Sequence, residues 1–248
     1  MTVPIVVISQ PTFLPWLGYF DLMDQATLFI ALDSVQFTKR SWMQRNRIRT
    51  PRGLEWLTVP VRVKGRYQQT LLQTQLNHEG GFPAKHLRTL EQNYRKTPYF
   101  GDYFPELARA LEERHTSLGE LNLQLIRWLA TTLGITTPIR RSSEMRANGQ
   151  RSALLAALCR EVDSRHYLST PGAADYIRDE QAVFREADIT VSFHRYQHPV
   201  YPQSGPGFEP YASVIDLLFH TGPDALQVIR SGRGHNLPAH TFFEEAAL

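Results

Sequence analysis

The sequence of 248 residues contains one cysteine, Cys159, and no run of eighteen apolar residues. A single cysteine cannot form an internal disulfide bond, which excludes the disulfide-stabilised secreted scaffolds and fits a reducing compartment. The lack of a long apolar run excludes a membrane-spanning helix. Because the N-terminus has neither a basic segment before an apolar stretch nor a signal-type cleavage site, we expect a cytoplasmic protein.

Motifs that define several enzyme classes are also missing. The sequence has no G-x-x-x-x-G-K-[ST] phosphate loop, no G-x-G-x-x-G fingerprint after its first apolar segment and no G-x-S-x-G nucleophile elbow. His194 and His198 have the spacing of two zinc ligands, but position 195 is Arg instead of Glu and Pro199 disfavours a helix there. We therefore predict no metal site and name no cofactor.

The charge is distributed unevenly along an otherwise ordinary globular composition, 42% hydrophobic and 21% charged. Residues 34–53, the basic island, hold six basic residues and no acidic one. Since the whole chain carries +3 and the basic island +6, the rest carries −3. This pattern favours a local site for an anionic small molecule over nucleic-acid binding, which usually spreads basic residues over a wider face.

Apolar periodicity predicts alternating strands and helices. We expect strands at 5–9, 28–32, 54–63, 70–76, around 139, at 167–169 and at 190–196, and helices at 17–26, 82–95, 104–114, 118–133, 150–162, 179–187, 213–220 and 224–231. Segments 54–63 and 70–76 are expected to pair, and the polar tail after 231 to be loose. The pattern predicts a single α/β domain over residues 1–248, with a Rossmann-like, mainly parallel sheet and a helical insertion at about 82–134.

The loop after the first predicted strand, residues 10–20, is the first candidate for a binding segment. In a parallel α/β sheet, ligands gather beyond the carboxyl ends of the strands, and the first turn of the following helix favours an anion. The candidate ligand-binding residues here are Gln10, Trp16, Gly18 and Tyr19. The alternative is that the prolines and aromatic residues of this loop only pack it down.

The second candidate, residues 33–47, follows the second predicted strand at the same edge of the sheet. Its arginines suit bidentate contacts with phosphate or carboxylate, and its tryptophan can stack on a base or a guanidinium. The candidate binding residues are Gln36, Lys39, Arg40, Trp42, Arg45, Asn46 and Arg47, and Asp33 is a candidate catalytic residue. The alternative is a solvated basic loop.

The third candidate follows the last predicted strand. His198 is the histidine that we nominate for proton transfer, and Tyr201 and Gln203 are candidate binding residues beside it. A capped turn, with His198 bonded to the backbone, is the alternative. Asp216 lies within an apolar helical segment, so it needs a partner, and we expect Arg45 or Arg47 in that role.

Together these segments resemble the WbqC-like protein family over about residues 3–232. The motifs are Gln10-Pro11-x-x-Leu14-Pro15-Trp16-x-Gly18-Tyr19-Phe20, Asp33-x-Val35-Gln36-x-x-Lys39-Arg40-Ser41-Trp42, Gln44-Arg45-Asn46-Arg47-Ile48, Trp56-Leu57-Thr58-Val59-Pro60-Val61, His198-Pro199-x-Tyr201-x-Gln203 and Ser213-x-Ile215-Asp216-Leu217-Leu218-Phe219. Such proteins are often encoded among genes for O-antigen and other surface polysaccharides. The resemblance therefore implies a role in making or decorating an activated sugar, as a transferase, without naming the reaction.

The strand–loop–helix–strand unit is also similar to that of HIGH-type nucleotidyltransferases, in which a Gly-His pair on the first helix contacts phosphate. Here Gly18 is followed by Tyr19, which carries no charge at neutral pH, so Lys39, Arg40 and Arg45 would have to supply the positive charge.

Two hypotheses remain open from the sequence. The first is a group-transfer enzyme whose substrate is a nucleotide-linked or other anionic sugar. The second is a non-catalytic protein that binds a nucleotide or a sugar nucleotide, or acts as a scaffold, within a polysaccharide assembly pathway.

Overall fold

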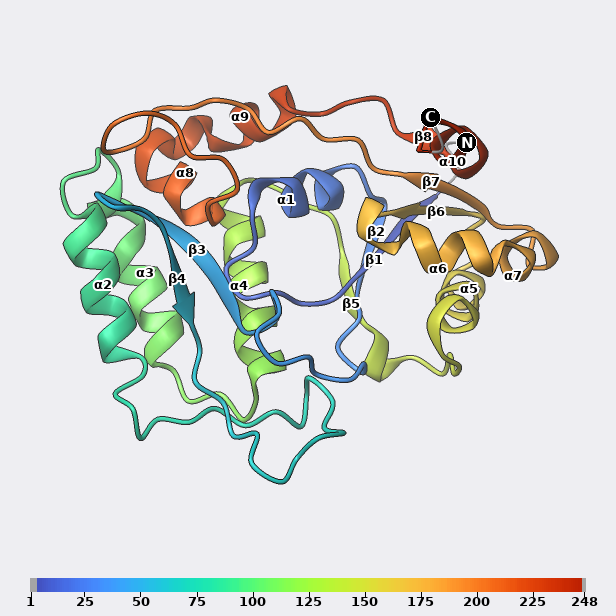
Figure 1. The fold of residues 1–248 in the computed structure, drawn as a ribbon, viewed down its shortest axis with the longest axis horizontal. Helices are drawn as coiled ribbons and strands as arrows, with labels where there is room; N and C mark the ends of the chain where they lie inside the picture. The colour runs from blue at the N-terminus through green and yellow to red at the C-terminus, as the bar shows by residue number, and fades with distance from the viewer. Residues whose placement is uncertain (1–3, 247–248) are drawn as a thin grey trace.

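A six-stranded sheet, described with the rest of residues 4–246 by a computed structural model, forms the centre of the molecule. Its strand order is β5-β2-β1-β6-β7-β8. The bounds are β1 (Ile5–Ser9), β2 (Leu28–Ala31), β5 (Ile139–Arg141), β6 (His166–Ser169), β7 (Thr190–Phe193) and β8 (Leu237–Pro238). The first five strands are parallel and β8 is antiparallel, so the fold is mixed α/β with a mostly parallel sheet (Figure 1).

Helices cover both faces of this sheet, as a parallel sheet requires. On one face, Val6 and Ile8 of β1 join a hydrophobic cluster with α5 (Arg151–Glu161), α6 (Ala174–Asp179) and α7 (Gln181–Glu186). Val7 points to the opposite face, where α1 (Leu17–Asp24), which connects β1 to β2, belongs to the second cluster. Alternate residues of the short apolar strands therefore serve two cores.

The second cluster continues into a block of further helices, seen on the left and top of Figure 1. They are α2 (Ala84–Tyr94), α3 (Phe100–Glu112), α4 (Leu118–Thr132), α8 (Val214–Thr221) and α9 (Ala225–Ser231). The helical segment that we predicted at about 82–134 is present, and its buried leucines share one hydrophobic cluster with the sheet. Gly134 follows α4 with a φ of 78°, a left-handed conformation that suits glycine at a helix end.

Two expectations about the strands are wrong. Residues 70–76 form no strand, and they do not pair along their length with 54–63; a single bridge joins Val61 to Leu76. Instead β4 (Gly53–Thr58) forms an antiparallel hairpin with β3 (Arg45–Thr50), which lies within the basic island. The strand pattern of β3 was not recognisable in the sequence, because arginines alternate with Asn46 and Ile48. In the structure Asn46 and Ile48 point inward, while the arginine side chains are only partly buried along their stems.

The tail after residue 231 also has regular structure in the part described, up to residue 246, contrary to expectation. Strand β8 pairs with β7, and α10 (Ala239–Glu245) follows it. The rings of Phe242 and Phe243 lie 4.3 Å and 5.3 Å from that of Phe193 at the end of β7. Burial of these rings holds the otherwise polar segment against the sheet.

A histidine beside the hairpin makes the stability depend on pH. The Nε2 of His86, on α2, is 2.9 Å from the carbonyl oxygen of Thr58, and its ring meets Phe82 edge-on at 4.9 Å. Burial lowers its pKa to about 4, against the opposing effect of the hydrogen bond to Thr58. The unfolded chain then binds the proton first, so stability is lost as the pH falls from about 6.5 towards 4.

We therefore expect His86→Gln, which keeps a donor for Thr58, to flatten the pH dependence of unfolding. Between pH 7.5 and pH 5, wild type is expected to lose about 1–2 kcal/mol more stability than the variant. Urea unfolding at both pH values measures this difference. Equal losses would show that His86 titrates alike in the folded and unfolded chains.

Candidate functional site

A cleft of about 500 Å³ opens beyond the carboxyl ends of β1, β6 and β7. The chain leaves β1 towards β2 on one side and leaves β6 towards β7 on the other, so the cleft lies where the connections diverge. Ligands of open α/β sheets bind at this kind of position. The residues that line the cleft include Ser9, Thr12, Trp16, Gly18, Tyr19, Trp42, Asn46, Arg47, Thr170, His194, Tyr196 and Tyr211.

His194 and Asp21 form a buried pair in this cleft. His194 is the first residue after β7, and its Nε2 lies 2.7 Å from Oδ2 of Asp21 on α1. An ionised carboxylate only accepts hydrogen bonds, so Nε2 carries the hydrogen and, in the neutral ring, Nδ1 carries the lone pair. In the described part of the chain, Nδ1 has no hydrogen-bond partner and is not sealed from solvent. The ring is therefore held in the form that accepts a proton at Nδ1.

Two further side chains fix Asp21. Arg233 donates from Nε to Oδ1 at 2.8 Å, and Gln25 donates to Oδ2 at 2.7 Å. Arg233 also bonds to Asp24, one turn along α1, which Arg230 contacts at 2.7 Å. Although partial burial alone raises it, hydrogen bonds from Arg230 and Arg233 hold the pKa of Asp24 below its usual value. The acids of α1 are thus anchored to Arg230 of α9 and to Arg233 just beyond it, which orients His194 indirectly.

An aromatic wall lines the side of the cleft near the start of α1. The Trp16 indole packs at 5.6 Å against both Tyr196 and Tyr211. A Cβ at Gly18 would overlap that indole, so a glycine is required there. Tyr211 has a φ of 66°, a strained value for a residue with a side chain, and its ring also meets His198 at 5.2 Å.

A cationic rim adjoins this wall, where Arg47 donates to the Tyr211 carbonyl at 3.5 Å. The guanidinium of Arg45 lies 4.0 Å over the Trp56 ring, and that of Arg47 lies 5.7 Å from the rings of Trp42 and Trp56. The Nε atoms of both arginines are buried and have no hydrogen-bond partner. Among residues 4–246, neither arginine forms an ion pair with an acid, whereas Arg49 of the same strand pairs with Glu209 at 3.3 Å. This rim therefore presents uncompensated positive charge.

A second lobe of about 380 Å³ adjoins the cleft, and both are lined by Ser9, Thr12, Trp42, Thr170 and Gly172. Seven of the residues proposed from the sequence line one lobe or the other: Gln10, Trp16, Gly18, Tyr19, Trp42, Asn46 and Arg47. Arg45 lies beside them through its contact with Trp56. The structure thus brings together most of the first segment with the end of the second.

Four other residues proposed in the second segment lie elsewhere. Asp33 is fully buried and accepts hydrogen bonds from Arg141 at 2.7 Å and from the hydroxyls of Ser142 at 3.0 Å and Ser143 at 2.9 Å. These hydrogen bonds use both carboxylate oxygens of Asp33 and connect the chain after β2 to the end of β5, which favours a structural role over catalysis. Gln36, Lys39 and Arg40 are exposed and line neither lobe.

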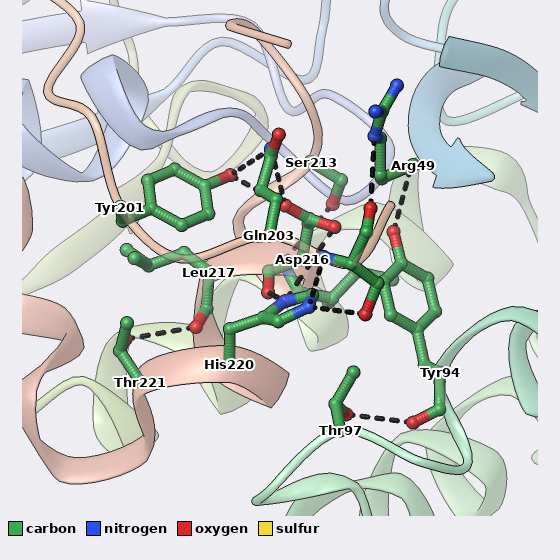
Figure 2. A network of polar contacts seen from close by, with 12 residues as sticks. Arg49, Tyr94, Thr97, Tyr201, Gln203, Ser213, Asp216, Leu217, His220 and Thr221 are labelled. Carbon is green, nitrogen blue, oxygen red and sulfur yellow. Dashed lines mark hydrogen bonds and ion pairs between the residues drawn. The ribbon is translucent and has the colours of Figure 1, made fainter. Parts of the chain in front are cut away.

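The third segment forms a polar network behind the cleft wall, shown in Figure 2. Oδ2 of Asp216 accepts 2.8 Å hydrogen bonds from the Tyr201 hydroxyl and from Gln203. The prediction that Arg45 or Arg47 pairs with Asp216 is therefore wrong: the bonded partners are neutral donors from the adjoining loop. Burial, followed by the nearby Asp216, raises the pKa of Tyr201 well above its usual value, so its hydroxyl stays protonated and donates.

His198 supports the same wall. Its Nδ1 donates to the Pro199 carbonyl at 2.9 Å, and its Nε2 is buried without a partner. Burial lowers the pKa of His198, against the smaller raising effects of Pro199 and Asp216. The ring stacks at 6.3 Å on Trp16 and does not line the cleft; with Tyr196 and Tyr211 it lines a neighbouring hollow of about 530 Å³. This geometry favours His194 over His198 as the group that meets a substrate.

His194 and Asp21 were missed in the sequence because the predicted strand ran on to residue 196. The strand ends at Phe193, and the first residue beyond a parallel strand is where a functional side chain is expected. An aspartate among the apolar residues of the first helix was a second available signal. Across residues 4–246, no three His, Cys, Asp or Glu side chains cluster as metal ligands, and no helix has the length and apolar character to cross a membrane.

Comparisons with known proteins identify relatives of the chain but no activity. The chain is 39% identical over 227 residues to the uncharacterized protein Rv1507c of Mycobacterium tuberculosis, covering 91% of this chain and 97% of that protein. No solved structure matches it significantly. The model of one family matches residues 10–228, which include both walls of the cleft and its cationic rim. The chain belongs to the WbqC-like protein family.

Proposed function

We propose that this protein is a group-transfer enzyme that acts on an anionic, nucleotide-linked sugar in surface polysaccharide biosynthesis. One observation carries the proposal: a cleft at the diverging strands holds an imidazole oriented by a buried carboxylate and an arginine rim without acidic partners. The strand order supports a Rossmann-like sheet, and the usual position of these genes supports the pathway. Sugar nucleotides are made in the cytoplasm, where we place the protein.

The chemistry assigned to His194 is general base catalysis. Nδ1 of His194 takes the proton of an acceptor hydroxyl, and the acceptor oxygen forms a bond to the anomeric carbon of the donor sugar. The bond from that carbon to the phosphate oxygen breaks, and the phosphate leaves with the electron pair. Asp21 stabilises the imidazolium that results, as a carboxylate does for a catalytic histidine, until the proton is released to solvent.

The role assigned to Arg47 and Arg45 is to bind the phosphates and to stabilise the charge that develops on the leaving group. Arginine suits this because its planar fork matches two phosphate oxygens. Stacking of both guanidinium groups on the indoles fixes their planes before a ligand arrives, which reduces the entropy lost on binding. The exposed part of Trp56 remains available to stack on a base.

Replacing Arg47 by Gln should weaken nucleotide binding about 10- to 100-fold, because a hydrogen bond to a charged group contributes about 1.5–3 kcal/mol. The measurement is calorimetric titration with UDP-, GDP-, dTDP- and CMP-sugars. Arg52→Gln is the matched control: it removes the same charge from the basic island, but Arg52 is exposed and already paired with Glu55 at 2.8 Å. Equal affinity in both variants would exclude Arg47 from the anion site.

A further inference from the structure

The second lobe of the cleft has a chemistry unlike that of the first. It lies over the carboxyl ends of β1, β2 and β6 and is lined by Leu32, Leu155 and the hydroxyl-bearing residues between them. No charged side chain lines it, whereas the first lobe has Arg47. A ligand that fits both lobes must therefore have one charged part and one uncharged part.

Polar groups without protein partners converge on this lobe. The five side chains concerned are Ser9, Gln10, Thr12, Thr170 and Tyr176. In the part of the chain that the structure describes, none of their hydroxyl or amide groups is hydrogen-bonded to protein, and none is sealed from solvent. Ser41, by contrast, already donates to Thr38 at 2.6 Å. The lobe thus offers several neutral donors and acceptors within one concave surface.

Trp42 supplies an apolar face at the junction of the two lobes. Its side chain is 46% exposed although it packs 5.2 Å from Trp56. A broad apolar ring beside a set of hydroxyls suits a ligand with one apolar face and a polar edge. No cation lines the lobe, and Arg151, whose guanidinium lies 5.8 Å from the Tyr176 ring, is already paired with Glu180 at 3.1 Å, so a carboxylate here gains little compensation. An acyl chain would leave the hydroxyl groups without partners, at a cost for each.

We propose that the second lobe is a subsite for an uncharged pyranose ring. The ring lies against Trp42, and its hydroxyls bond with Gln10, Thr12, Thr170 and Tyr176. The assignment rests on the proposed function for the nature of the whole substrate, since a nucleotide-linked sugar places phosphate at Arg47 and the ring beside it. It adds that the sugar is neutral and that a uronic acid is rejected.

The test uses methyl glycosides of glucose, galactose, mannose and N-acetylglucosamine, with methyl glucuronide as the charged counterpart. Binding is followed by saturation-transfer NMR and by calorimetry, without nucleotide and with saturating UDP or GDP. We expect at least one neutral glycoside to bind and the glucuronide to bind at least about tenfold more weakly. The variants are Gln10→Leu and Tyr176→Phe, which change the second lobe alone.

Each variant should weaken binding of the neutral glycoside about 3- to 10-fold, the usual effect of one lost hydrogen bond. Gln68→Leu and Tyr67→Phe, the matched controls at exposed positions outside the cleft, should leave it unchanged. The proposal is overturned if none of the four neutral glycosides binds, with or without nucleotide. It is also overturned if the variant that combines Gln10→Leu with Tyr176→Phe binds the glycoside with full affinity. Wild type separates the two proposals: if it binds a neutral glycoside but none of the UDP-, GDP-, dTDP- and CMP-sugars, the proposed function fails and the sugar subsite stands. Arg47→Gln should lose nucleotide affinity and keep glycoside affinity.

Discussion

Replacing His194 by Gln should lower the rate of group transfer about 10²- to 10⁴-fold, the usual contribution of a positioned general base. Gln keeps a donor for Asp21 and a similar volume, but it has no lone pair that takes up a proton near neutral pH. Binding of the donor should change by no more than about threefold, because the phosphate contacts belong to Arg47 and Arg45. Release of the nucleotide leaving group, a nucleoside diphosphate or CMP according to the donor that binds, measures the rate.

Two companion variants make this result specific. His235→Gln changes an exposed histidine outside the cleft and should retain the full rate. Asp21→Asn should lower the rate without affecting donor affinity, because the amide no longer selects one tautomer of His194. A full rate in His194→Gln would refute the base assignment. Tight donor binding with no transfer by wild type would instead favour the non-catalytic nucleotide-binding protein.

The sheet and half of the cleft follow from local sequence patterns. Short β-branched runs such as 5–9 predict buried parallel strands, and the carboxyl ends of such strands meet at one edge. Gln10, Trp42 and Arg47 were therefore predictable as neighbours although 37 positions separate the first from the last. Local patterns predict the edge of the sheet at which a side chain emerges. For the segments that follow β1 and β2, this was enough to predict which residues lie close together.

Partners far apart in the sequence were not predictable in the same way. Asp21 is 173 positions from His194 and 212 from Arg233, and no periodicity in α1 indicates which distant cation will meet its acid. That Asp216 needs a partner was predictable from its apolar helix. We expected an arginine in that role, whereas the structure supplies the neutral donors Tyr201 and Gln203. Periodicity shows that a polar group is buried; the path of the connecting loops decides what satisfies it.

Asp216 carries the second large effect that we predict. Asp216→Ala should reduce the stability of folding by about 3 kcal/mol, because it leaves both the Tyr201 hydroxyl and the Gln203 amide without an acceptor. For a chain of this size, the melting temperature should fall by roughly 6–12 °C. The measurement is thermal unfolding by circular dichroism.

Asp216→Asn distinguishes loss of an acceptor from loss of charge. Its side-chain oxygen still accepts from Tyr201 and Gln203, while its NH₂ group replaces Oδ1, which in Asp216 is buried without a hydrogen bond and lies 3.9 Å from Nδ1 of His220. We therefore expect Asn to cost less than about 1 kcal/mol. If Asn destabilises the protein as much as Ala does, the charge of Asp216 is what the network requires. If both variants melt like wild type, the network does not stabilise the fold. Since the loop that Asp216 holds leads to Tyr211 in the cleft wall, the Ala variant should also bind the donor more weakly than the Asn variant.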